Sequence, residues 1–456
     1  MTNLKTLLMR TLIALAVLGF TTAAHGKLSP LHVEGAFLVN AEGTRVNLHG
    51  FCETYSSWFN EQNTQWTGLD VNGCLNYHKR LTDRILQAGW KMTFVRQHMD
   101  PHWTNVLPQG VYYVPENDIT YFNFDRFKKY LDEVYVPMAE YAISKGLYVV
   151  MRPPGVCPEN ICVGDKYHQY LLKVWEYVAQ HEKLKDNGCV MFELANEPIN
   201  IVNSNGSRAG DKEMTEWVQQ IVDVIRKHAS NVLLIPGLGY QSHYKGFLSY
   251  PVKGENLGYA VHCYPGWYNG GWGQGDISVN YAGFKQGWDD QIGSVAKTAP
   301  IVVTEMDWAP SKYNSSWGKS NTGTAGGNGF GANFHKLCDD TQNVSWVLFT
   351  DMHLLAQYDD QKPDGQTFLT DPEACPRPCY RWFQQYATEE YNNMINQPGY
   401  GPEGITPALT DNDIVSREYY TLDGRKAVSR PAGLHIVKEQ WRDGKTICRK
   451  VISNQL

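Results

Sequence analysis

Short apolar runs alternate along this chain with segments whose apolar residues recur at helical spacing. The apolar runs start with the strand that contains Val46 and continue at 90–98, 147–151, 190–194, 232–235, 259–262, 301–304 and 346–349. Helical spacing marks 124–141, 171–179 and 214–224 between them. Apolar strands that alternate with helices form a parallel sheet buried on both faces. Eight of them predict an α/β fold, a (β/α)₈ TIM barrel over 25–396. The alternative is an open doubly wound sheet, although no GxGxxG follows any of the strands.

The first 24 residues have the pattern of a secretory signal peptide. Lys5 and Arg10 precede an apolar run at 11–20, and Thr22-Ala23-Ala24 supplies small residues for cleavage. The alternative is an N-terminal membrane anchor, for which this apolar run is short. The sequence therefore predicts export, through the periplasm to the outer cell surface or the medium.

The composition changes near residue 416. Residues 416–456 hold nine Lys or Arg and four Asp or Glu, a net charge of +5, whereas the whole chain carries −6. Asp423-Gly424 and Asp443-Gly444 are hairpin-turn dipeptides between β-prone segments. We expect a small β module over 416–456, joined to the barrel by a linker at 397–415.

The composition also restricts the function. Only 19% of the residues are charged and the net charge is negative, which argues against a nucleic-acid binder, because such a protein needs a basic face. The 14 Trp, 27 Tyr and 16 Phe residues suit stacking on sugar rings, and equally suit a large core. The ten cysteines include the close pairs Cys157/Cys162 and Cys375/Cys379, which lack the spacing of a zinc site and are interpreted as disulfides or buried thiols.

Chemically useful side chains stand where the predicted strands end, which is where barrels place their active sites. These residues are Arg96, His98, Asn196, Glu197, His262, Tyr264, Glu305 and, on the eighth strand, Trp346. Two carboxylates at one mouth suit glycoside hydrolysis, in which one carboxyl protonates the leaving oxygen and the other attacks the anomeric carbon. This chemistry needs neither a cofactor nor a metal.

The ordered set of Arg96, the NEP tripeptide at 196–198, His262-x-Tyr264, Glu305 and Trp346 resembles glycoside hydrolase family 5, the cellulase-type barrels, over about residues 28–390. The resemblance implies that Glu197 is the acid/base and that Glu305 is the nucleophile.

The same resemblance implies roles for the remaining strand-end residues. Asn196 would hold the sugar 2-hydroxyl, Arg96 would brace Glu305, and His262 and Tyr264 would line the −1 subsite above a floor made by Trp346. His98 is a further substrate-binding candidate. Family members often end their third strand with a histidine, whereas this chain has Arg152 there.

The tail resembles the type IX secretion sorting domain of exported proteins in YYTLDGR at 419–425, PAGLHIV at 431–437 and DGK at 443–445. This implies secretion machinery as a partner. The alternative is a small structural β cap on the barrel.

The sequence as a whole predicts an exported, monomeric, retaining glycoside hydrolase that cleaves β-1,4-linked plant glucans as an endoglucanase of the cellulase type. Mannan, xyloglucan or mixed-linkage glucan is the alternative substrate, and a non-catalytic glycan-binding barrel is the alternative of another class. The loops at 264–275 and 321–333 extend the mouth, and their Trp267, Tyr268 and Trp272, with Trp317 nearby, are expected to stack on outer sugars or to anchor the loops.

Overall fold

The computed structural model describes residues 28–53, 69–111, 114–264, 266–268, 281–306, 330–349, 352–358, 377–397, 414–422, 424–427, 433–441 and 446–453. The chain divides into two compact units, Met1–Pro402 and Glu403–Leu456. The predicted signal peptide, most of the predicted linker, and Trp272 and Trp317 lie outside the described residues.

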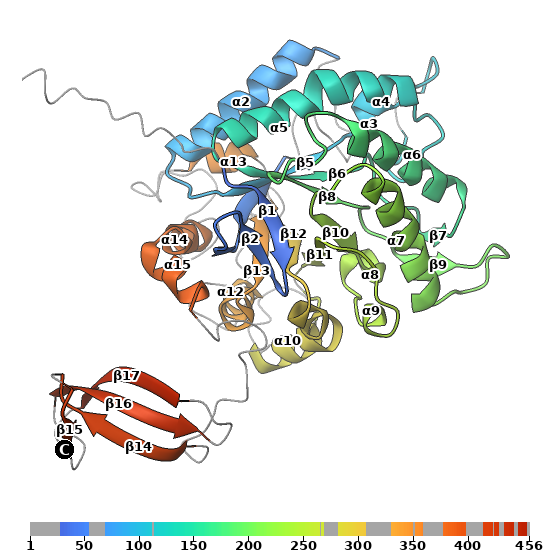
Figure 1. Cartoon of the computed structure of the whole chain (residues 1–456). Coiled ribbons are helices and arrows are strands. Elements are labelled where there is room, and N and C mark those ends of the chain that lie inside the picture. The colour runs from blue at the N-terminus through green and yellow to red at the C-terminus, as the bar shows by residue number, and fades with distance from the viewer. Residues whose placement is uncertain are drawn as a thin grey trace, which may run out of the picture. The chain divides into compact units, whose positions relative to one another are not determined.

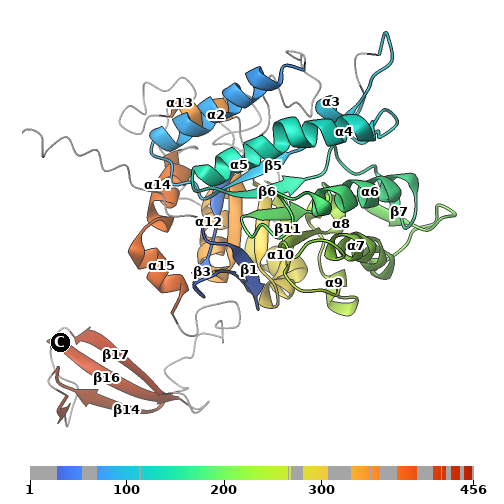
Figure 2. The ribbon, with the colours of Figure 1, turned by 45° about the horizontal axis from the view of Figure 1, so that its top comes forward.

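The first unit is a closed barrel of eight parallel strands, with its helices outside (Figures 1 and 2). In spatial order the strands are β4 (His49–Cys52), β5 (Phe94–His98), β6 (Tyr148–Arg152), β8 (Val190–Glu193), β10 (Leu233–Pro236), β11 (Leu257–Cys263), β12 (Ile301–Met306) and β13 (Val344–Leu348), which pairs again with β4. The predicted (β/α)₈ barrel is confirmed.

Helices surround this barrel, and short polar side chains begin several of them. The helical segments are α2 (Val71–Gln87), α3 (Pro101–Thr104), α4 (Phe124–Tyr130), η1 (Leu131–Tyr135), α5 (Val136–Ser144), α6 (Lys166–Gln180), α7 (Asp211–Arg226), α8 (Leu238–Gln241), α9 (Gly246–Ser249), α10 (Tyr281–Trp288), η2 (Asp289–Gly293), η3 (Val295–Lys297), α12 (Phe330–Thr341), α13 (Met352–Gln357), α14 (Arg377–Tyr386) and α15 (Glu389–Ile395). Asp70, Asn123 and Asp165 each accept a backbone N–H from the first turn of α2, α4 and α6.

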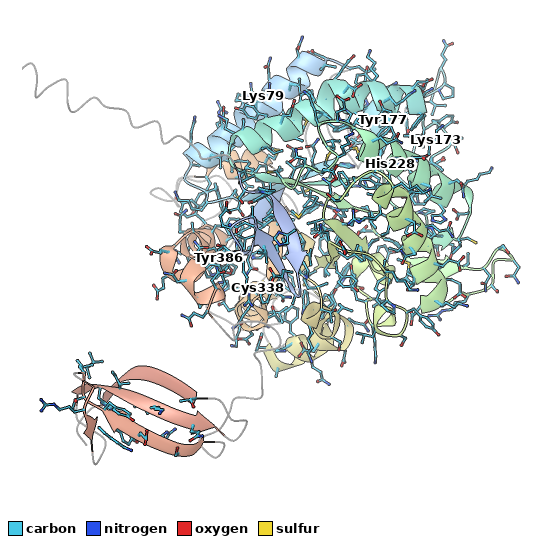
Figure 3. The ribbon with its side chains drawn as sticks, viewed as in Figure 1. Lys79, Lys173, Tyr177, His228, Cys338 and Tyr386 are labelled. Atoms are coloured by element: carbon cyan, nitrogen blue, oxygen red, sulfur yellow. The ribbon has the colours of Figure 1, made fainter. Side chains whose placement is uncertain are left out.

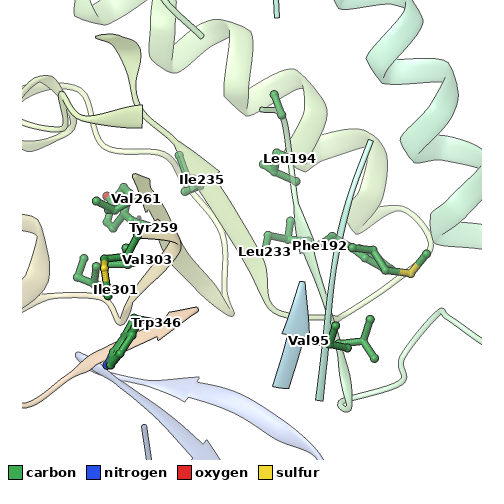
Figure 4. Packing of buried hydrophobic residues seen from close by; sticks show 14 of the residues in the cluster. Val95, Phe192, Leu194, Leu233, Ile235, Tyr259, Val261, Ile301, Val303 and Trp346 are labelled. Carbon is green, nitrogen blue, oxygen red and sulfur yellow. The ribbon is translucent and has the colours of Figure 1, made fainter. Parts of the chain in front are cut away.

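Side chains alternate along each barrel strand between two hydrophobic layers. Outward residues such as Val95, Phe192 and Ile301 join the layer beneath the helices, part of which Figure 4 shows. Cys338 of α12 and Tyr386 of α14, labelled in Figure 3, are buried in the same layer. This layer holds the helices to the barrel.

A small antiparallel sheet closes the end of the barrel opposite the mouth. It consists of β1 (Leu31–Glu34), β2 (Phe37–Asn40) and β3 (Arg45–Val46). Leu31 and Leu38 pack among inward-facing barrel residues, including Phe94 and Val347. At this contact, a Cβ on Gly188 would lie 2.5 Å from the Pro30 Cβ, so the chains approach this closely only at glycine. With this end filled, the opposite end is left for chemistry.

The second unit contains an antiparallel sheet with the strand order β15-β14-β16-β17. Its strands are β14 (Ile414–Tyr420), β15 (Lys426–Ala427), β16 (Gly433–Trp441) and β17 (Thr446–Ser453). The strands on either side of Asp423-Gly424 and of Asp443-Gly444 are paired, although Asp423 and the second dipeptide lie outside the described residues. The predicted β structure of the tail is confirmed.

Two smaller observations complete the fold. A parallel pair, β7 (Asn160–Cys162) with β9 (Asn200–Val202), joins the loops that follow β6 and β8. Cys157 and Cys162 are thiols with no disulfide between them. None of the helices in the described ranges combines the length and apolar character needed to cross a bilayer.

Candidate active site

The site lies at the carboxyl ends of the barrel strands, and alternation along each strand decides which side chains reach it. On β5, Phe94 faces the inner apolar layer and Val95 the helices, which turns Arg96 inward. On β8 the same alternation directs Glu193 inward, just before Asn196 and Glu197. Strand β12 brings Glu305 to the same place.

Arg96 is the structural centre of the site. Its Nη1 donates to Glu305 Oε1 at 2.6 Å, and its Nη2 donates to Asn196 Oδ1 at 2.6 Å. On the other side, Nε and Nη2 bind the two oxygens of Glu193 at 2.7 and 2.9 Å. Burial opposes the charge of Arg96, but Glu193 and Glu305 outweigh it and raise the guanidinium pKa well above its ordinary value. Arg96 is therefore a permanent cation that fixes a carboxylate on each side.

Glu193 is a third carboxylate, deeper than the other two and fully buried. Besides Arg96, it accepts hydrogen bonds from Thr304 Oγ1 at 3.0 Å and Gln241 Nε2 at 3.1 Å. Burial alone would raise its pKa, but Arg96, followed by His262, lowers that pKa well below the ordinary value. Glu193 therefore stays ionised beneath the mouth.

His262, near the end of β11, stands between the three carboxyl groups. Its Nδ1 lies 3.0 Å from Glu197 Oε1 and 3.5 Å from Glu305 Oε2, and its Nε2 lies 3.9 Å from Glu193 Oε1. Burial would lower its pKa, but Glu305 together with Glu193 and Glu197 raises the pKa to about 9. At neutral pH the ring is an imidazolium, so Nδ1–H is a donor to the carboxylates.

Glu197 and Glu305 face each other across this ring. One oxygen of each carboxyl group and a His262 nitrogen all lie within 4.8 Å of one another. The Tyr264 hydroxyl donates to Glu305 Oε2, the oxygen that Arg96 leaves open. The Glu197 side chain is 25% exposed and that of Glu305 only 6%, so Glu197 is the more accessible to solvent.

These three groups are also of the kinds that bind a metal ion. The Arg96 guanidinium lies 2.6 Å from Glu305, where its charge would repel a divalent cation. In addition, a protonated His262 has no lone pair to offer on Nδ1. The arrangement therefore suits proton transfer and nucleophilic attack better than metal binding.

The expectation that Trp346 forms the floor of the site is wrong. Its ring is fully buried and packs edge-on against Phe334 of α12 and Phe383 of α14, at centroid distances of 5.4 and 4.8 Å. Because Ser345 and Val347 point into the barrel, Trp346 points outward, to the helices (Figure 4).

Phe349 is the aromatic residue that the eighth strand brings near the mouth instead. Phe349 stands three residues beyond Trp346, so the alternation of side chains along a strand places it on the opposite face. Its ring lies 6.4 Å from that of Tyr264. The ring of Trp267 lies 5.3 Å from that of Tyr264 and is partly exposed. Tyr268 is buried and donates to the His262 carbonyl at 3.1 Å, so it anchors its loop.

His98 and Arg152 end neighbouring strands and are both fully buried. His98 Nδ1 lies 3.6 Å from Asp100 Oδ2, and Arg152 Nη1 donates to the Gly155 carbonyl at 2.6 Å. These contacts place His98 in the wall of the barrel, and its contact with substrate stays a prediction.

The structure thus brings together Arg96, Asn196, Glu197, His262, Tyr264 and Glu305, as the strand ends predict. It adds Glu193, Gln241 and Phe349, which the sequence reasoning missed. A charged residue inside the apolar run at 190–194 is a signal that could have identified Glu193. Counting strand parity from Trp346 could have identified Phe349.

Comparison with known proteins bears on the family and on the fold. The family model for Cellulase (glycosyl hydrolase family 5) matches residues 39–325. The native beta-glucanase SdGluc5_26A from Saccharophagus degradans is 17% identical, with a TM-score of 0.51 over 78% of this chain and 92% of its own. The structure of the same enzyme in complex with cellotetraose gives the same values: 17% identity and a TM-score of 0.51 over 78% of this chain and 92% of its own.

An endocellulase from the archaeon Pyrococcus horikoshii is 15% identical, with a TM-score of 0.43 over 71% of this chain and 91% of its own. The likeness to the Saccharophagus degradans enzyme speaks for the fold, while the family match covers more than half of the chain. This chain belongs to glycosyl hydrolase family 5, and it is a glycoside hydrolase.

Proposed function

We propose that the protein is a retaining, endo-acting β-glucanase with Glu305 as nucleophile and Glu197 as acid/base. The observation that carries this proposal is the separation of the two carboxyl groups, whose facing oxygens lie within 4.8 Å of each other. Retaining glycosidases hold their carboxyl groups about 5–5.5 Å apart, whereas inverting enzymes need about 6.5–9.5 Å to admit a water molecule.

The reaction proceeds in two steps. In the first, the carboxylic acid of Glu197 protonates the glycosidic oxygen as that oxygen leaves, and Glu305 forms an ester with the anomeric carbon. In the second, the Glu197 carboxylate removes a proton from water, the hydroxide attacks the same carbon, and the ester to Glu305 breaks. Two displacements on one carbon return the β configuration.

The neighbouring groups prepare each carboxyl for its role. Arg96 and Tyr264 each donate to one oxygen of Glu305, which orients the nucleophile and stabilises its charge before attack. His262 donates toward both carboxylates from a single nitrogen and keeps them in register. Arg96 also holds the Asn196 amide oxygen, which turns the amide nitrogen toward a sugar hydroxyl.

A β-glucan is the substrate that we propose. The related glucanase from Saccharophagus degradans binds cellotetraose, a β-1,4-linked glucose oligomer. Tyr264 and Trp267, both partly exposed, form a pair of rings at the mouth that suits stacking on the flat faces of glucose units. Mannan, xyloglucan and mixed-linkage glucan remain as alternative polymers for the same chemistry.

The test is hydrolysis of a panel of β-glucans and mannans, with sizing of the products and NMR of the first anomer released. We expect β-configured products of mixed length from cellulose-type glucans. Glu305→Gln should lower kcat by several orders of magnitude, whereas Glu140→Gln, which alters an exposed ion pair with Lys183, should not. Azide should restore to the Glu197→Ala variant its turnover of activated glycosides. An α-configured first product would refute the retaining assignment.

We further propose that residues 1–24 direct export and that residues 416–456 are read by a secretion system. The basic charge of the tail, the acidic charge of the rest of the chain, and the absence of the strand-end carboxylates from the tail support this division. Deleting 416–456 should leave purified activity unchanged and retain the protein in the periplasm of its host. Loss of activity on deletion would instead make the tail part of the enzyme.

A further inference from the structure

We infer that Gln241 is a positioning residue that holds the acid/base Glu197 in its working conformation. This inference rests on the proposed function of Glu197. Gln241 connects an unusual backbone turn to a buried hydrogen-bond network. The inference thus gives a role to the segment that follows β10.

The turn consists of three successive residues in the left-handed region. Gly239 has φ 60° and ψ 49°, Tyr240 has φ 60° and ψ 43°, and Gln241 has φ 61°. Residues other than glycine avoid this region because Cβ crowds the following carbonyl, so consecutive examples persist only where the surroundings hold them. Glu197, whose backbone is also in the left-handed region at φ 55°, lies opposite this turn.

The two strained segments hold each other through their backbones. The Gly239 N–H donates to the Ile199 carbonyl at 3.1 Å, and the Tyr240 N–H donates to the Pro198 carbonyl at 3.0 Å. The turn therefore lies directly against the two residues that follow Glu197. A change in either segment is passed to the other through these bonds.

The Gln241 side chain completes the contact at Glu197 itself. Its Oε1 accepts the Glu197 N–H at 2.7 Å, while its Nε2 donates to Glu193 Oε1 at 3.1 Å and to the Ala260 carbonyl at 3.3 Å. The amide orientation is determined by its partners, because a backbone N–H can only donate and an ionised carboxylate can only accept. Fully buried Gln241 thus ties Glu197 to β8 and β11.

This link bears on one step of the reaction. Glu305 is held directly by Arg96 and Tyr264. Gln241 reaches it only indirectly, through Glu193 and Arg96, so the loss of Gln241 acts mainly on Glu197. Without Gln241, the Glu197 N–H loses its acceptor, the left-handed conformation loses a restraint, and the acid moves from its place beside the glycosidic oxygen. Displacements of about 1 Å lower rates by roughly 10²-fold.

The experiment compares two aryl β-cellobiosides on the full-length enzyme. A phenyl group leaves poorly and needs protonation by Glu197, whereas a 2,4-dinitrophenyl group leaves without it. For Gln241→Met, which preserves shape and removes the hydrogen bonds, kcat/KM should fall about 10²-fold on the phenyl substrate. It should change by less than about threefold on the dinitrophenyl substrate.

Two further variants separate positioning from general damage. In a Glu197→Ala background, adding Gln241→Met should cause no further loss on the phenyl substrate, because both changes act on one step. Gln342→Met is the matched control: Gln342 is also left-handed, at φ 65°, but it follows α12, away from the carboxylates. It should leave both substrates unaffected.

Each result decides the matter. Equal losses on the two leaving groups, full additivity with Glu197→Ala, or no loss at all would overturn the inference. If Gln241→Met does not fold, Gln241→Asn keeps the amide but is one methylene shorter than the reach to the Glu197 N–H, and its loss must again fall on the phenyl substrate alone. A wild-type enzyme inactive on both cellobiosides and on every β-glucan would refute the proposed function, and the inference with it.

Discussion

Replacing Glu193 with Gln tests whether a buried charge beneath the mouth holds the barrel together. The carboxylate accepts two hydrogen bonds from Arg96, one from Thr304 and one from Gln241. The amide of glutamine has the same shape but no charge, and its NH₂ group would face side chains that are themselves hydrogen-bond donors. Removing one partner of a buried ion pair costs about 3–5 kcal/mol. Since Arg96 keeps Glu305, we expect the lower end, about 3 kcal/mol.

The corresponding change in melting temperature is small but measurable. Unfolding entropy is about 2.1 cal/mol/K per residue, or about 0.8 kcal/mol/K for a body of about 400 residues, so 3 kcal/mol lowers Tm by about 4 °C. Thr304→Val is the matched control, because it removes one hydrogen bond to the same carboxylate oxygen but leaves the charge, and it should cost about 1.5 kcal/mol. Calorimetry at pH 7 is the assay.

The pH dependence gives a second readout. The folded-state pKa of Glu193 is lowered below its ordinary value of 4.5, so the stability that it contributes is complete above that pH. That stability is lost as the pH falls toward the folded-state pKa. The difference in Tm between wild type and Glu193→Gln should therefore be constant above about pH 5 and should narrow below about pH 4. The reasoning would be refuted if wild type and Glu193→Gln had the same Tm at pH 7, or if the difference between their Tm values increased at acid pH.

Tyr264→Phe removes a donor to Glu305 and should lower kcat about 10²-fold with little change in Tm, as initial rates on a soluble glucan will show. Trp346→Ala should destabilise the fold by about 3–5 kcal/mol in denaturant titrations, whereas Trp346→Phe should leave KM for glucan unchanged; a large rise in KM would return this ring to the substrate site. Burial lowers the pKa of His335 to about 4, so stability present above pH 6.5 is lost as the pH falls through 4. His335→Phe, which preserves stacking on Trp382, should reduce the loss of Tm between pH 7 and pH 4.5, and an unchanged loss would contradict this.

The fold could be predicted because strands that are buried on both faces leave a continuous apolar signal. Each apolar run between 90–98 and 346–349 overlaps a barrel strand, and the ends differ by a few residues. The active-site carboxylates follow from the same signal, since parallel strands end on one side of the barrel. Glu197 and Glu305 are 108 positions apart in the chain, yet only strand order was needed to bring them together.

The missed residues depend on geometry that a local pattern does not encode. Trp346 was misplaced because its residue type was weighed without the period of two that turns it outward. Gln241 reaches Glu197 only through the left-handed turn at 239–241, and no local motif reports that turn. Predictions from sequence alone thus work where position along a strand decides, and fail where a turn re-aims a side chain.

The small sheet of β1, β2 and β3 also bears on how the chain folds. Three hydrogen bonds of this sheet and of Leu48, which follows it, reach across most of the barrel sequence. Asn343 Nδ2 donates to the Ala36 carbonyl at 2.9 Å, the Leu48 N–H to Ser345 Oγ at 2.9 Å, and the Arg45 N–H to Asn396 Oδ1 at 2.8 Å. Their partners are 307, 297 and 351 residues apart. Contacts this distant in sequence form late and slow folding, because loop entropy is lost before they stabilise anything.

During synthesis, β4 stays an unpaired edge on one side until β13 has left the ribosome, because these two strands close the ring. A nascent chain that stops before residue 344 therefore exposes two open edges and an unfilled interior, the surfaces through which unfinished proteins associate. We expect such chains to depend on chaperones, and the complete barrel to be free of that requirement.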